Sequence, residues 1–266
     1  MTRVPFTKME GCGNDYVFVD AIRDALPLAR GAELARAWSH RHFGIGGDGL
    51  IVLTRGERAP VRMHMWNADG SRGAMCGNGL RCLAVLAFAH GHLRDRRFVV
   101  ETDAGLRPVE LLAEGEVRTG MGEVQVGAPE RLRVGDGWLE LTRGSAGNPH
   151  AVVFVADVET ADVHGLGALL QQHPTFTDGV NVEFVQVDGP DRLRQRTFER
   201  GSGETLACGT GATVAALAAR AQRRIQAEVV HVALRGGALR VECGASTLAL
   251  VGPTRTVFDG EVELPR

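Results

Sequence analysis

The sequence predicts an α+β protein with two pseudo-symmetric domains, each a curved and mostly antiparallel sheet wrapped around a buried central helix. Three observations predict this fold class. One segment pattern occurs twice, strand-like runs outnumber helical runs in both halves, and each half contains one helical run that is apolar on nearly every side. A helix that is apolar all round must be enclosed by protein, so we expect each sheet to enclose one helix.

The internal repeat is clearest around two cysteines. Cys76–Val85 and Cys208–Leu217 both begin with Cys-Gly-x-Gly and continue into an apolar helical run, 132 positions apart. Since a repeat at a fixed offset is the signature of a duplicated architecture, we interpret the chain as two halves of one design. Two more pairs keep nearly the same offset: Asn14 with Asn148, and Asn67 with Glu199.

Short runs of β-branched and aromatic residues predict the strands. In the first half they are residues 16–19, 50–53, 61–66, 98–102 and 106–112. In the second half they are residues 151–155, 180–187, 195–199, 229–234, 238–243 and 248–251. The helical pattern predicts amphipathic helices at 32–42 and 163–172, and buried helices at 80–89 and 212–221.

The length of 266 residues fits two domains. We expect the border in the glycine-containing stretch 119–127, which gives an N-terminal half of residues 1–120 and a C-terminal half of residues 121–253. The short tail 254–266 is expected to return to the N-terminal half and complete it.

Composition narrows the classes of partner. With 30 basic and 32 acidic side chains the formal charge is only −2, which argues against nucleic-acid or anionic-membrane binding driven by bulk charge. The apolar stretches are far shorter than the ~20 residues that span a bilayer, and the first 16 residues lack an apolar signal region. We therefore expect a cytoplasmic protein. Five cysteines, an odd number, indicate separate reduced thiols instead of disulfides.

Cys-Gly-x-Gly at the start of a helix favours anions. The first N–H groups of a helix have no partner within the helix, and the helix dipole adds partial positive charge there. Glycines remove side chains from the path of a ligand to these amides. A cysteine in this position is expected to have its pKa lowered below the usual ~8.5. Pseudo-symmetry predicts that Cys76 and Cys208 face one another across a cleft between the halves.

Two opposed, chemically equal acid and base groups suit inversion of a carbon centre, the reaction of racemases and epimerases. One group removes a proton from one face and the other delivers a proton to the opposite face, most efficiently when both pKa values lie near the working pH. Helix N-termini would stabilise the charge that develops on a substrate carboxylate. We expect no cofactor and no metal, because no metal-binding or nucleotide-binding motif accompanies the cysteines.

Two other classes compete with this interpretation. A redox or thiolate-metal protein could use Cys76 and Cys208, although the chain contains no Cys-x-x-Cys. A noncatalytic amino-acid-binding module would not need paired thiols, and entry of solvent deuterium at the substrate α-carbon would distinguish it from an epimerase.

The chain resembles the diaminopimelate epimerases, cofactor-independent enzymes of the lysine pathway, over nearly its whole length. The segments that carry the resemblance are Lys8–Asp15, Arg41–Gly46, Asn67–Ser71, Met75–Gly79, Gly147–His150, Val180–Val182, Glu199–Gly201 and Ala207–Gly211. The resemblance implies that Cys76 and Cys208 are the acid/base thiols, that the substrate is diaminopimelate in its LL and meso forms, and that the protein is a homodimer.

The resemblance also implies the substrate contacts. At the reacting centre they are Asn14, Asn78 and the amides of Gly77, Gly209 and Thr210. At the distal amino-acid end they are Asn67, Asn148, Asn181, Glu199 and Arg200. A second carboxylate and ammonium require a guanidinium and a carboxylate, which Arg200 and Glu199 supply. Related enzymes racemise proline, hydroxyproline or histidine, and these substrates have no second carboxylate. The pair Glu199 and Arg200 therefore discriminates between diaminopimelate and these substrates.

Three further features follow from the resemblance. His150, with Glu199, is implied to tune the pKa of the thiols or to order the site. Gly49 stands where many members have glutamine, so no side-chain contact can be transferred there. Cys12, Cys82 and Cys243 are interpreted as packing or loop residues.

Overall fold

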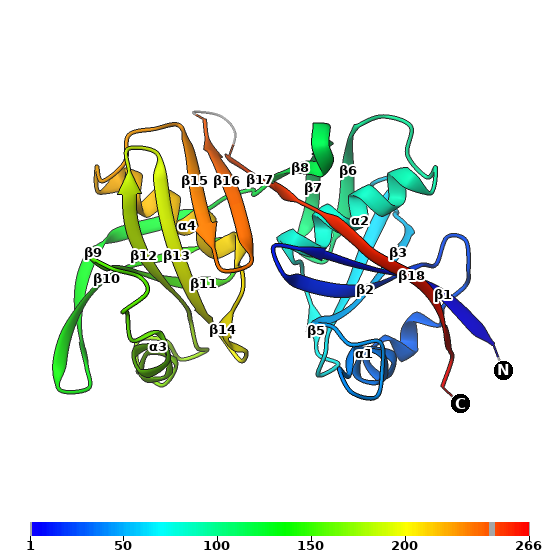
Figure 1. Ribbon diagram of the computed structural model, residues 1–266, viewed down its shortest axis with the longest axis horizontal. Helices are drawn as coiled ribbons and strands as arrows, with labels where there is room; N and C mark the ends of the chain where they lie inside the picture. Colours follow the sequence, from blue (N-terminus) through cyan, green and yellow to red (C-terminus); the bar gives the residue numbers. More distant parts are fainter. Residues whose placement is uncertain (1, 245–247, 266) are drawn as a thin grey trace. The chain divides into compact units, whose positions relative to one another are not determined.

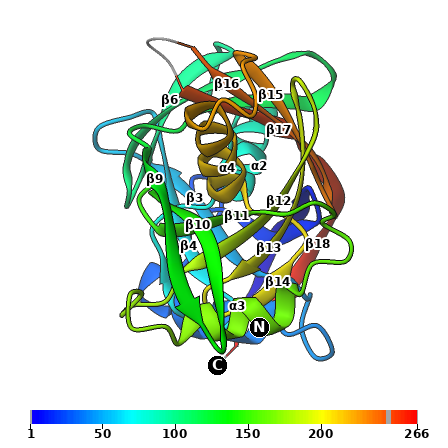
Figure 2. The same ribbon diagram turned by 90° about the vertical axis from the view of Figure 1, so that its left-hand side faces the viewer.

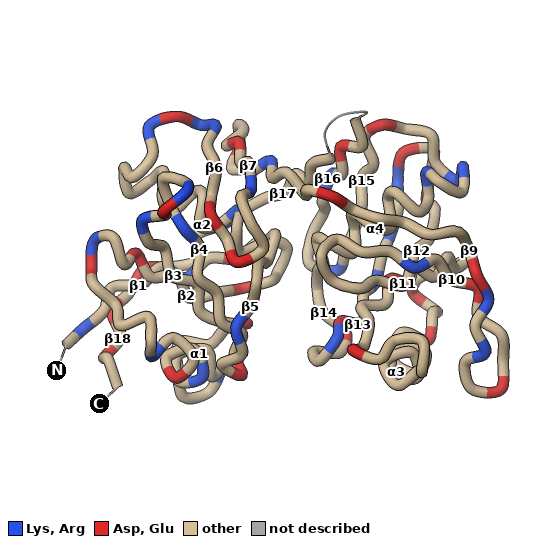
Figure 3. The backbone as a smooth tube through the Cα atoms, turned by 180° about the vertical axis from the view of Figure 1, so that it is seen from behind, with Lys and Arg blue, Asp and Glu red and all other residues tan. Residues whose placement is uncertain are grey.

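The protein is described by a computed structural model that places residues 2–244 and 248–265. The chain forms two compact units (Figure 1). Unit 1 comprises Met1–Thr119 together with Gly252–Arg266, and unit 2 comprises Gly120–Val251. Both basic and acidic residues occur along the chain of each unit (Figure 3).

The described residues of unit 1 form nine strands, of which β8 ends one residue beyond the border of the unit: β1 (Arg3–Gly11), β2 (Asn14–Asp20), β3 (Gly49–Arg55), β4 (Val61–Asn67), β5 (Arg72–Gly73), β6 (Arg97–Thr102), β7 (Gly105–Leu111), β8 (Glu116–Gly120) and β18 (Arg255–Glu263). Its helices are η1 (Leu28–Arg30), α1 (Gly31–Ser39), α2 (Gly77–Ala89) and η2 (Ala113–Gly115).

Unit 2 repeats this order with β9 (Gln125–Val134), β10 (Gly137–Ser145), β11 (Pro149–Phe154), β12 (Asn181–Gly189), β13 (Arg192–Glu199), β14 (Gly203–Thr205), β15 (Val229–Leu234), β16 (Gly237–Cys243) and β17 (Leu248–Pro253). Its helices are α3 (Val163–Gln171) and α4 (Gly209–Ala221).

The strand pairing is the same in the two units. In unit 1 the order is β18-β1-β2-β3-β4-β6-β7-β8, and β5 also pairs with β4; in unit 2 it is β9-β10-β11-β12-β13-β15-β16-β17, and β14 also pairs with β13. The parallel pairs also correspond, because β2–β3 and β4–β6 match β11–β12 and β13–β15. The other strand pairs within each unit are antiparallel. The predicted fold class is therefore confirmed, including the duplication.

The register identifies equivalent residues. In the parallel pair of unit 1 Tyr16 lies opposite Gly49, and in that of unit 2 His150 lies opposite Asn181. His150 is thus the counterpart of Tyr16, and two residues along the next strand Glu183 is the counterpart of Ile51. These equivalences keep the offset of the sequence repeat.

Each unit wraps its sheet around one helix, α2 or α4, as predicted. In α2, 10 of the 13 residues are buried, and Leu80 and Leu83 belong to the core cluster that includes Ile51 and Met63 of the sheet. In α4 the buried face consists mainly of alanine, the best helix former. Figure 2 shows α4 enclosed by the strands of unit 2.

Several predicted boundaries were wrong. Helix α1 ends at Ser39, three residues before the predicted end, because the chain folds back and the amides of Ile45 and Gly46 bond to the carbonyl oxygen of Trp38. These bonds satisfy carbonyls that a longer helix would have used. The long strands β1, β9, β10 and β18 and the short strands β5, β8 and β14 were missed. In β9 most residues are exposed, so the strand has little apolar alternation for a sequence pattern to detect.

One histidine in unit 1 predicts a pH effect on stability. Burial, followed by the charges of Arg72 and Arg62, lowers the pKa of His64 from 6.5 to about 4. The neutral ring fits its site because Nδ1 accepts a hydrogen bond from Arg72 Nη2 at 2.9 Å. Between pH 6.5 and 4 the unfolded chain therefore binds a proton that the folded protein does not.

We expect the free energy of unfolding to fall as the pH is lowered through this window, by about 1–2 kcal/mol from this group, less than the full shift implies because the ring is partly exposed. Urea unfolding at pH 7 and pH 4.5 measures it. His64→Gln should reduce the pH difference, whereas His42→Gln, at an exposed position, should leave it unchanged. An equal pH difference in the two variants would contradict the assignment.

Candidate active site

Two cysteines begin the two central helices. Cys76 is the N-cap of α2 and Cys208 is the N-cap of α4, and both have extended backbone angles. The sulfur of Cys76 accepts the amide N–H of Gly79 at 3.5 Å, and that of Cys208 accepts the amide N–H of Gly211 at 3.4 Å. The helices therefore start directly after the cysteines, three residues earlier than the apolar pattern predicts, and each sulfur satisfies an amide that has no partner within its helix.

The glycines three residues after each cysteine serve packing. A Cβ atom on Gly79 would lie 2.4 Å from Ile51 Cδ1, and one on Gly211 would lie 2.3 Å from Glu183 Oε1. Sequence reasoning assigned these glycines to the approach of a ligand. The structure shows that they also allow the helix N-termini to pack against β3 and β12.

In unit 1 an amide network surrounds Cys76. Its thiol donates to Asn14 Oδ1 at 3.2 Å, and Asn78 Nδ2 donates to the same oxygen at 3.3 Å. Asn14 Nδ2 donates to Asp48 Oδ2 at 2.5 Å, so the carboxylate fixes the amide with its oxygen toward the thiol. Asp48 was not identified from the sequence.

The second amide of this network is held by a buried cation. Arg81 is fully buried on α2, and its Nη2 donates to Asn78 Oδ1 at 2.7 Å. Its Nε donates to the carbonyl oxygen of Pro253 at 3.5 Å, and its Nη1 has no partner among the described residues. Burial lowers the pKa of Arg81 from its ordinary value. The sequence did not identify Arg81 as a site residue, because the run around it was interpreted as a helix that is apolar on nearly every side.

A group of ion pairs lies beside this network. Asp15 contacts Lys8 at 2.6 Å and Arg41 at 2.7 Å, and Arg41 also contacts Asp48 at 2.9 Å. Burial acts to raise the pKa of Asp15, but the hydrogen bonds from Arg41 and Lys8 outweigh it and the pKa is lowered. These pairs fix the loop that carries Asp48.

Tyr16 completes the surroundings of Cys76. It is buried, and burial raises its pKa well above 10, with a further contribution from Cys76. The phenol therefore stays protonated and neutral at ordinary pH.

In unit 2 the surroundings of Cys208 are ionisable. The donor atoms of His150, Glu183 and Cys208 lie within 4.8 Å of one another, and all three residues are buried. His150 Nδ1 is 2.9 Å from Glu183 Oε1, and His150 Nε2 is 3.0 Å from Asn148 Oδ1. The other oxygen of Glu183, Oε2, has no partner among the described residues. Glu183 was not identified from the sequence, although the offset of 132 from the apolar Ile51 marks it as a charged residue in a core position.

Burial, followed by the nearby carboxylates Glu199 and Glu183, raises the pKa of Cys208 well above 9. The expected lowering by the helix N-terminus was therefore wrong for this cysteine. The amide of Gly211 and the hydroxyl of Thr210, 3.4 Å from Sγ, do lower the pKa, but burial in an acidic environment has the larger effect. Burial likewise raises the pKa of Glu183, despite the opposing effect of His150.

Symmetry had led us to expect chemically equal sites for the two cysteines. The structure shows that the two sites differ. Where unit 1 has Tyr16 and Ile51, unit 2 has the ionisable pair His150 and Glu183. A buried cation, Arg81, anchors the network around Cys76, whereas carboxylates lie near Cys208. Duplication preserved the backbone and the caps, and divergence at the neighbouring positions made the two thiols different.

The remaining predicted site residues divide between the units. Asn14, Asn67, Gly77 and Asn78 accompany Cys76 in unit 1, and Asn148, His150, Asn181, Glu199, Arg200, Gly209 and Thr210 accompany Cys208 in unit 2.

Some of these side chains have partners within the protein. Asn67 Nδ2 donates to Ser71 Oγ at 2.9 Å. Asn181 donates to the carbonyl oxygen of Pro149 at 2.9 Å and accepts the amide of Arg200 at 3.1 Å, so it holds the segment that presents Arg200. The guanidinium of Arg200 is on an exposed residue and donates to the carbonyl oxygen of Asp178 at 3.1 Å.

Gly49 leaves no space for a side chain. A Cβ atom there would lie 2.2 Å from the carbonyl oxygen of Trp66 and 3.1 Å from Tyr16 Cε1. Strand β4 thus approaches β3 more closely than a larger residue at this position allows.

The other cysteines lie in packed surroundings. Cys82 is part of the core cluster around α2, and burial raises its pKa to about 12. Burial also raises the pKa of Cys12 and of Cys243. All five cysteines belong to the described part of the chain, and none forms a disulfide.

Comparison with known proteins decides the family. The sequence model of diaminopimelate epimerase matches residues 6–127 and 144–257. The chain is 42% identical to the diaminopimelate epimerase of Geobacillus kaustophilus over 98% of its own length and 97% of the relative's. It is 37% identical to that of Leptospira biflexa over 98% and 100%, respectively.

The chain belongs to the diaminopimelate epimerase family. It is an isomerase of the epimerase type, and the resemblance found in the sequence is confirmed.

Solved structures of other proteins share this fold. A phenazine biosynthesis protein of the PhzF family from Bacillus anthracis superposes with a TM-score of 0.75 at 16% identity, over 99% of this chain and 100% of the other. A hydroxyproline epimerase from Agrobacterium vitis superposes with a TM-score of 0.72 at 16% identity, over 98% and 92%. At such identities the likeness shows the fold alone. In the part of the chain that is described, no helix is long and apolar enough to cross a membrane.

Proposed function

We propose that this epimerase interconverts LL-diaminopimelate and meso-diaminopimelate by a two-base reaction in which Cys76 and Cys208 are the catalytic residues. The observation that carries the proposal is the pair of cysteine N-caps on equivalent helices in unlike environments. No cofactor is needed, because the two sulfur atoms supply both proton transfers.

The proton transfers balance within one turnover. A thiolate removes the proton from the substrate α-carbon and becomes a thiol. The opposite thiol delivers its proton to the other face of the same carbon and becomes a thiolate. The enzyme then carries its proton on the other sulfur, ready for the reverse reaction or for exchange with solvent. Charge on the substrate carboxylate is stabilised by amide N–H groups of Gly77, Gly209 and Thr210 at the helix N-termini.

The surroundings of Cys208 support one assignment of the resting state. Because burial and nearby carboxylates raise the pKa of Cys208, it holds a proton and acts first as the acid. Cys76 then acts first as the base, after it loses the proton that its thiol donates to Asn14 Oδ1 in this structure. His150, ordered by Glu183 and Asn148, is the positioning residue next to Cys208.

Arg200 and Glu199 are proposed to bind the distal amino-acid end of the substrate, with Asn67, Asn148 and Asn181 forming or holding that part of the site. Glu199 accepts the hydroxyl of Thr205 at 2.6 Å, which fixes one carboxylate oxygen. A guanidinium can bind a carboxylate through two parallel hydrogen bonds, whereas an ammonium is a point charge.

We expect Arg200→Lys to lower kcat/KM for LL-diaminopimelate by about 10- to 100-fold, the value of one charge-assisted hydrogen bond. Steady-state kinetics measure it. Arg131→Lys on the exposed strand β9 is the matched control and should change nothing. An unaltered kcat/KM in Arg200→Lys would remove this residue from the substrate site.

A chiral assay tests the function itself. LL-diaminopimelate is incubated with the reduced protein without added cofactor, and the meso isomer is measured. Proline and 4-hydroxyproline are the comparison substrates, because a protein of this fold is named as a hydroxyproline epimerase. Turnover of these compounds, with none of diaminopimelate, would refute the proposed substrate. We further propose a homodimer, which sedimentation equilibrium tests.

A further inference from the structure

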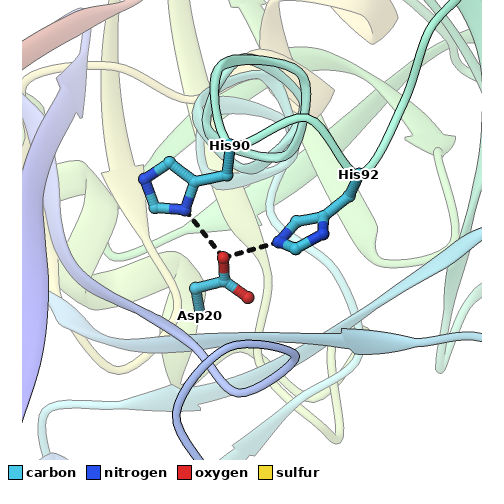
Figure 4. Close-up of side chains that lie close together, drawn as sticks. All are labelled: Asp20, His90 and His92. Atoms are coloured by element: carbon cyan, nitrogen blue, oxygen red, sulfur yellow. Dashed lines mark hydrogen bonds and ion pairs between the residues drawn. The ribbon is translucent and has the colours of Figure 1, made fainter.

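A second cluster of ligand-type side chains lies in unit 1, at the end of α2 opposite to Cys76. Figure 4 shows Asp20, from the end of β2, with His90 and His92 on either side of its carboxylate. Asp20 Oδ2 is 2.7 Å from His90 Nδ1 and 2.6 Å from His92 Nε2. Since α2 has 13 residues, with a rise of 1.5 Å each, the cluster is about 20 Å from the helix start. The proposed reaction gives it no role.

The local backbone builds this cluster. His90 is the C-cap of α2, and Gly91 follows with a φ of 77°, a left-handed turn that favours glycine. The amide of Gly91 donates to Phe88 O and the amide of His92 donates to Ala87 O, both at 3.0 Å. This turn reverses the chain and brings the His92 ring back to the same carboxylate as the His90 ring.

The carboxylate is anchored from the other side. Asp20 Oδ1 accepts the amide N–H of Ile22 at 3.0 Å, which leaves Oδ2 directed at the two rings. The Asp20 side chain is only 6% exposed, and the side chains of His90 and His92 are 26% and 11% exposed. The donors are therefore mostly shielded, with one side accessible to water.

The donor set is typical of a transition-metal site. Two imidazole nitrogens and one carboxylate oxygen are ligands that Zn²⁺ and similar divalent ions prefer. The three donor atoms all lie within 4.8 Å of one another. Around Zn²⁺, with ligand distances of about 2.0–2.2 Å, they need to be about 3.3 Å apart, so each ring nitrogen must move away from Asp20 Oδ2 by less than about 1 Å.

We propose that Asp20, His90 and His92 form a binding site for a divalent transition metal ion of the Zn²⁺ class, with water as the fourth ligand. Binding replaces the two hydrogen bonds to Asp20 Oδ2. The proton on the ligating nitrogen of each ring passes to solvent, and the other ring nitrogen carries the proton of the bound imidazole. The bound ion joins the end of β2 to the end of α2 and so stabilises unit 1.

A neighbouring arginine competes with the ion. Arg23 Nε is 3.8 Å from Asp20 Oδ2, and its Nη2 donates to the carbonyl oxygen of His90 at 3.1 Å. Its side chain is half exposed and can turn away, at the cost of that hydrogen bond. Removing the guanidinium should therefore tighten metal binding.

Binding is tested on the full chain with the competing thiols removed. In a Cys76→Ser, Cys208→Ser background treated with EDTA and dialysed, Zn²⁺ is titrated by calorimetry at pH 7.5, and Co²⁺ is titrated by visible absorption. We expect one equivalent of each ion, a tetrahedral Co²⁺ spectrum without thiolate charge transfer, and a rise in Tm with Zn²⁺ concentration.

Variants decide whether the ion is at this cluster. His90→Ala and His92→Ala should each weaken binding by at least about 100-fold, the exposed control His42→Ala should not change it, and Arg23→Ala should strengthen it. Histidine ring signals in NMR spectra should shift for His90 and His92 alone. The site would be overturned if the parent protein bound no ion, or if His90→Ala and His92→Ala bound the ion as tightly as the parent. These readouts are independent of epimerase activity.

Discussion

Cys76→Ala and Cys208→Ala are each expected to lower the rate of epimerisation at least about 10³-fold, because inversion needs both an acid and a base. Each variant keeps one functional sulfur, which can remove and return a proton on a single face. We therefore expect each variant to exchange the α-hydrogen of only one stereoisomer with solvent. Chiral chromatography measures inversion, and NMR spectroscopy in D₂O measures exchange.

The structure offers a matched control for this experiment. Cys82 lies on the same helix as Cys76, but its buried thiol has a pKa raised to about 12 and belongs to the core. Cys82→Ala should therefore retain activity within a few-fold and change mainly stability. If Cys76→Ala or Cys208→Ala kept activity within tenfold of the native enzyme, the two-base mechanism would be wrong.

Glu183→Gln is expected to move the pH dependence of the reaction. The Glu183 carboxylate helps to raise the pKa of Cys208, and Cys208 must be protonated to act as the acid. Activity is thus lost as the pH rises through the Cys208 pKa. Without the negative charge this pKa falls, so the alkaline limb of kcat/KM should shift to lower pH by roughly one unit. A pH–rate profile measures the shift.

The Glu183 variants also separate charge from shape. Because burial raises the pKa of Glu183, an ionised carboxylate here costs stability at neutral pH, and Glu183→Gln should remain folded. Glu183→Asp keeps the charge and should keep the alkaline limb in place even if kcat falls. Glu130→Gln, at an exposed ion pair, is the neutral control. An unmoved alkaline limb in a folded Glu183→Gln enzyme would show that the carboxylate does not act on Cys208.

Much of the fold was predictable because its signals are local or repeated. The apolar runs of α2 and α4 indicate enclosed helices whatever surrounds them, and the offset between Cys76 and Cys208 indicates duplication without any structural information. Strand β9 was not predictable in this way. Residues 127–129 are all exposed and interrupt the alternation that residues 130–134 show, so no continuous strand pattern appears, although the partner β10 follows after only two residues.

The sequence by itself determined the duplicated α+β architecture, the family and the two cysteines, because these depend on residue type and spacing along the chain. Only the tertiary structure decided what surrounds each sulfur. Arg81 and Glu183 both interrupt apolar patterns, and only packing shows that one anchors the amides beside Cys76 and the other lies near Cys208. The physical reason is that burial and neighbouring charges set a pKa, and both depend on residues far apart in the sequence.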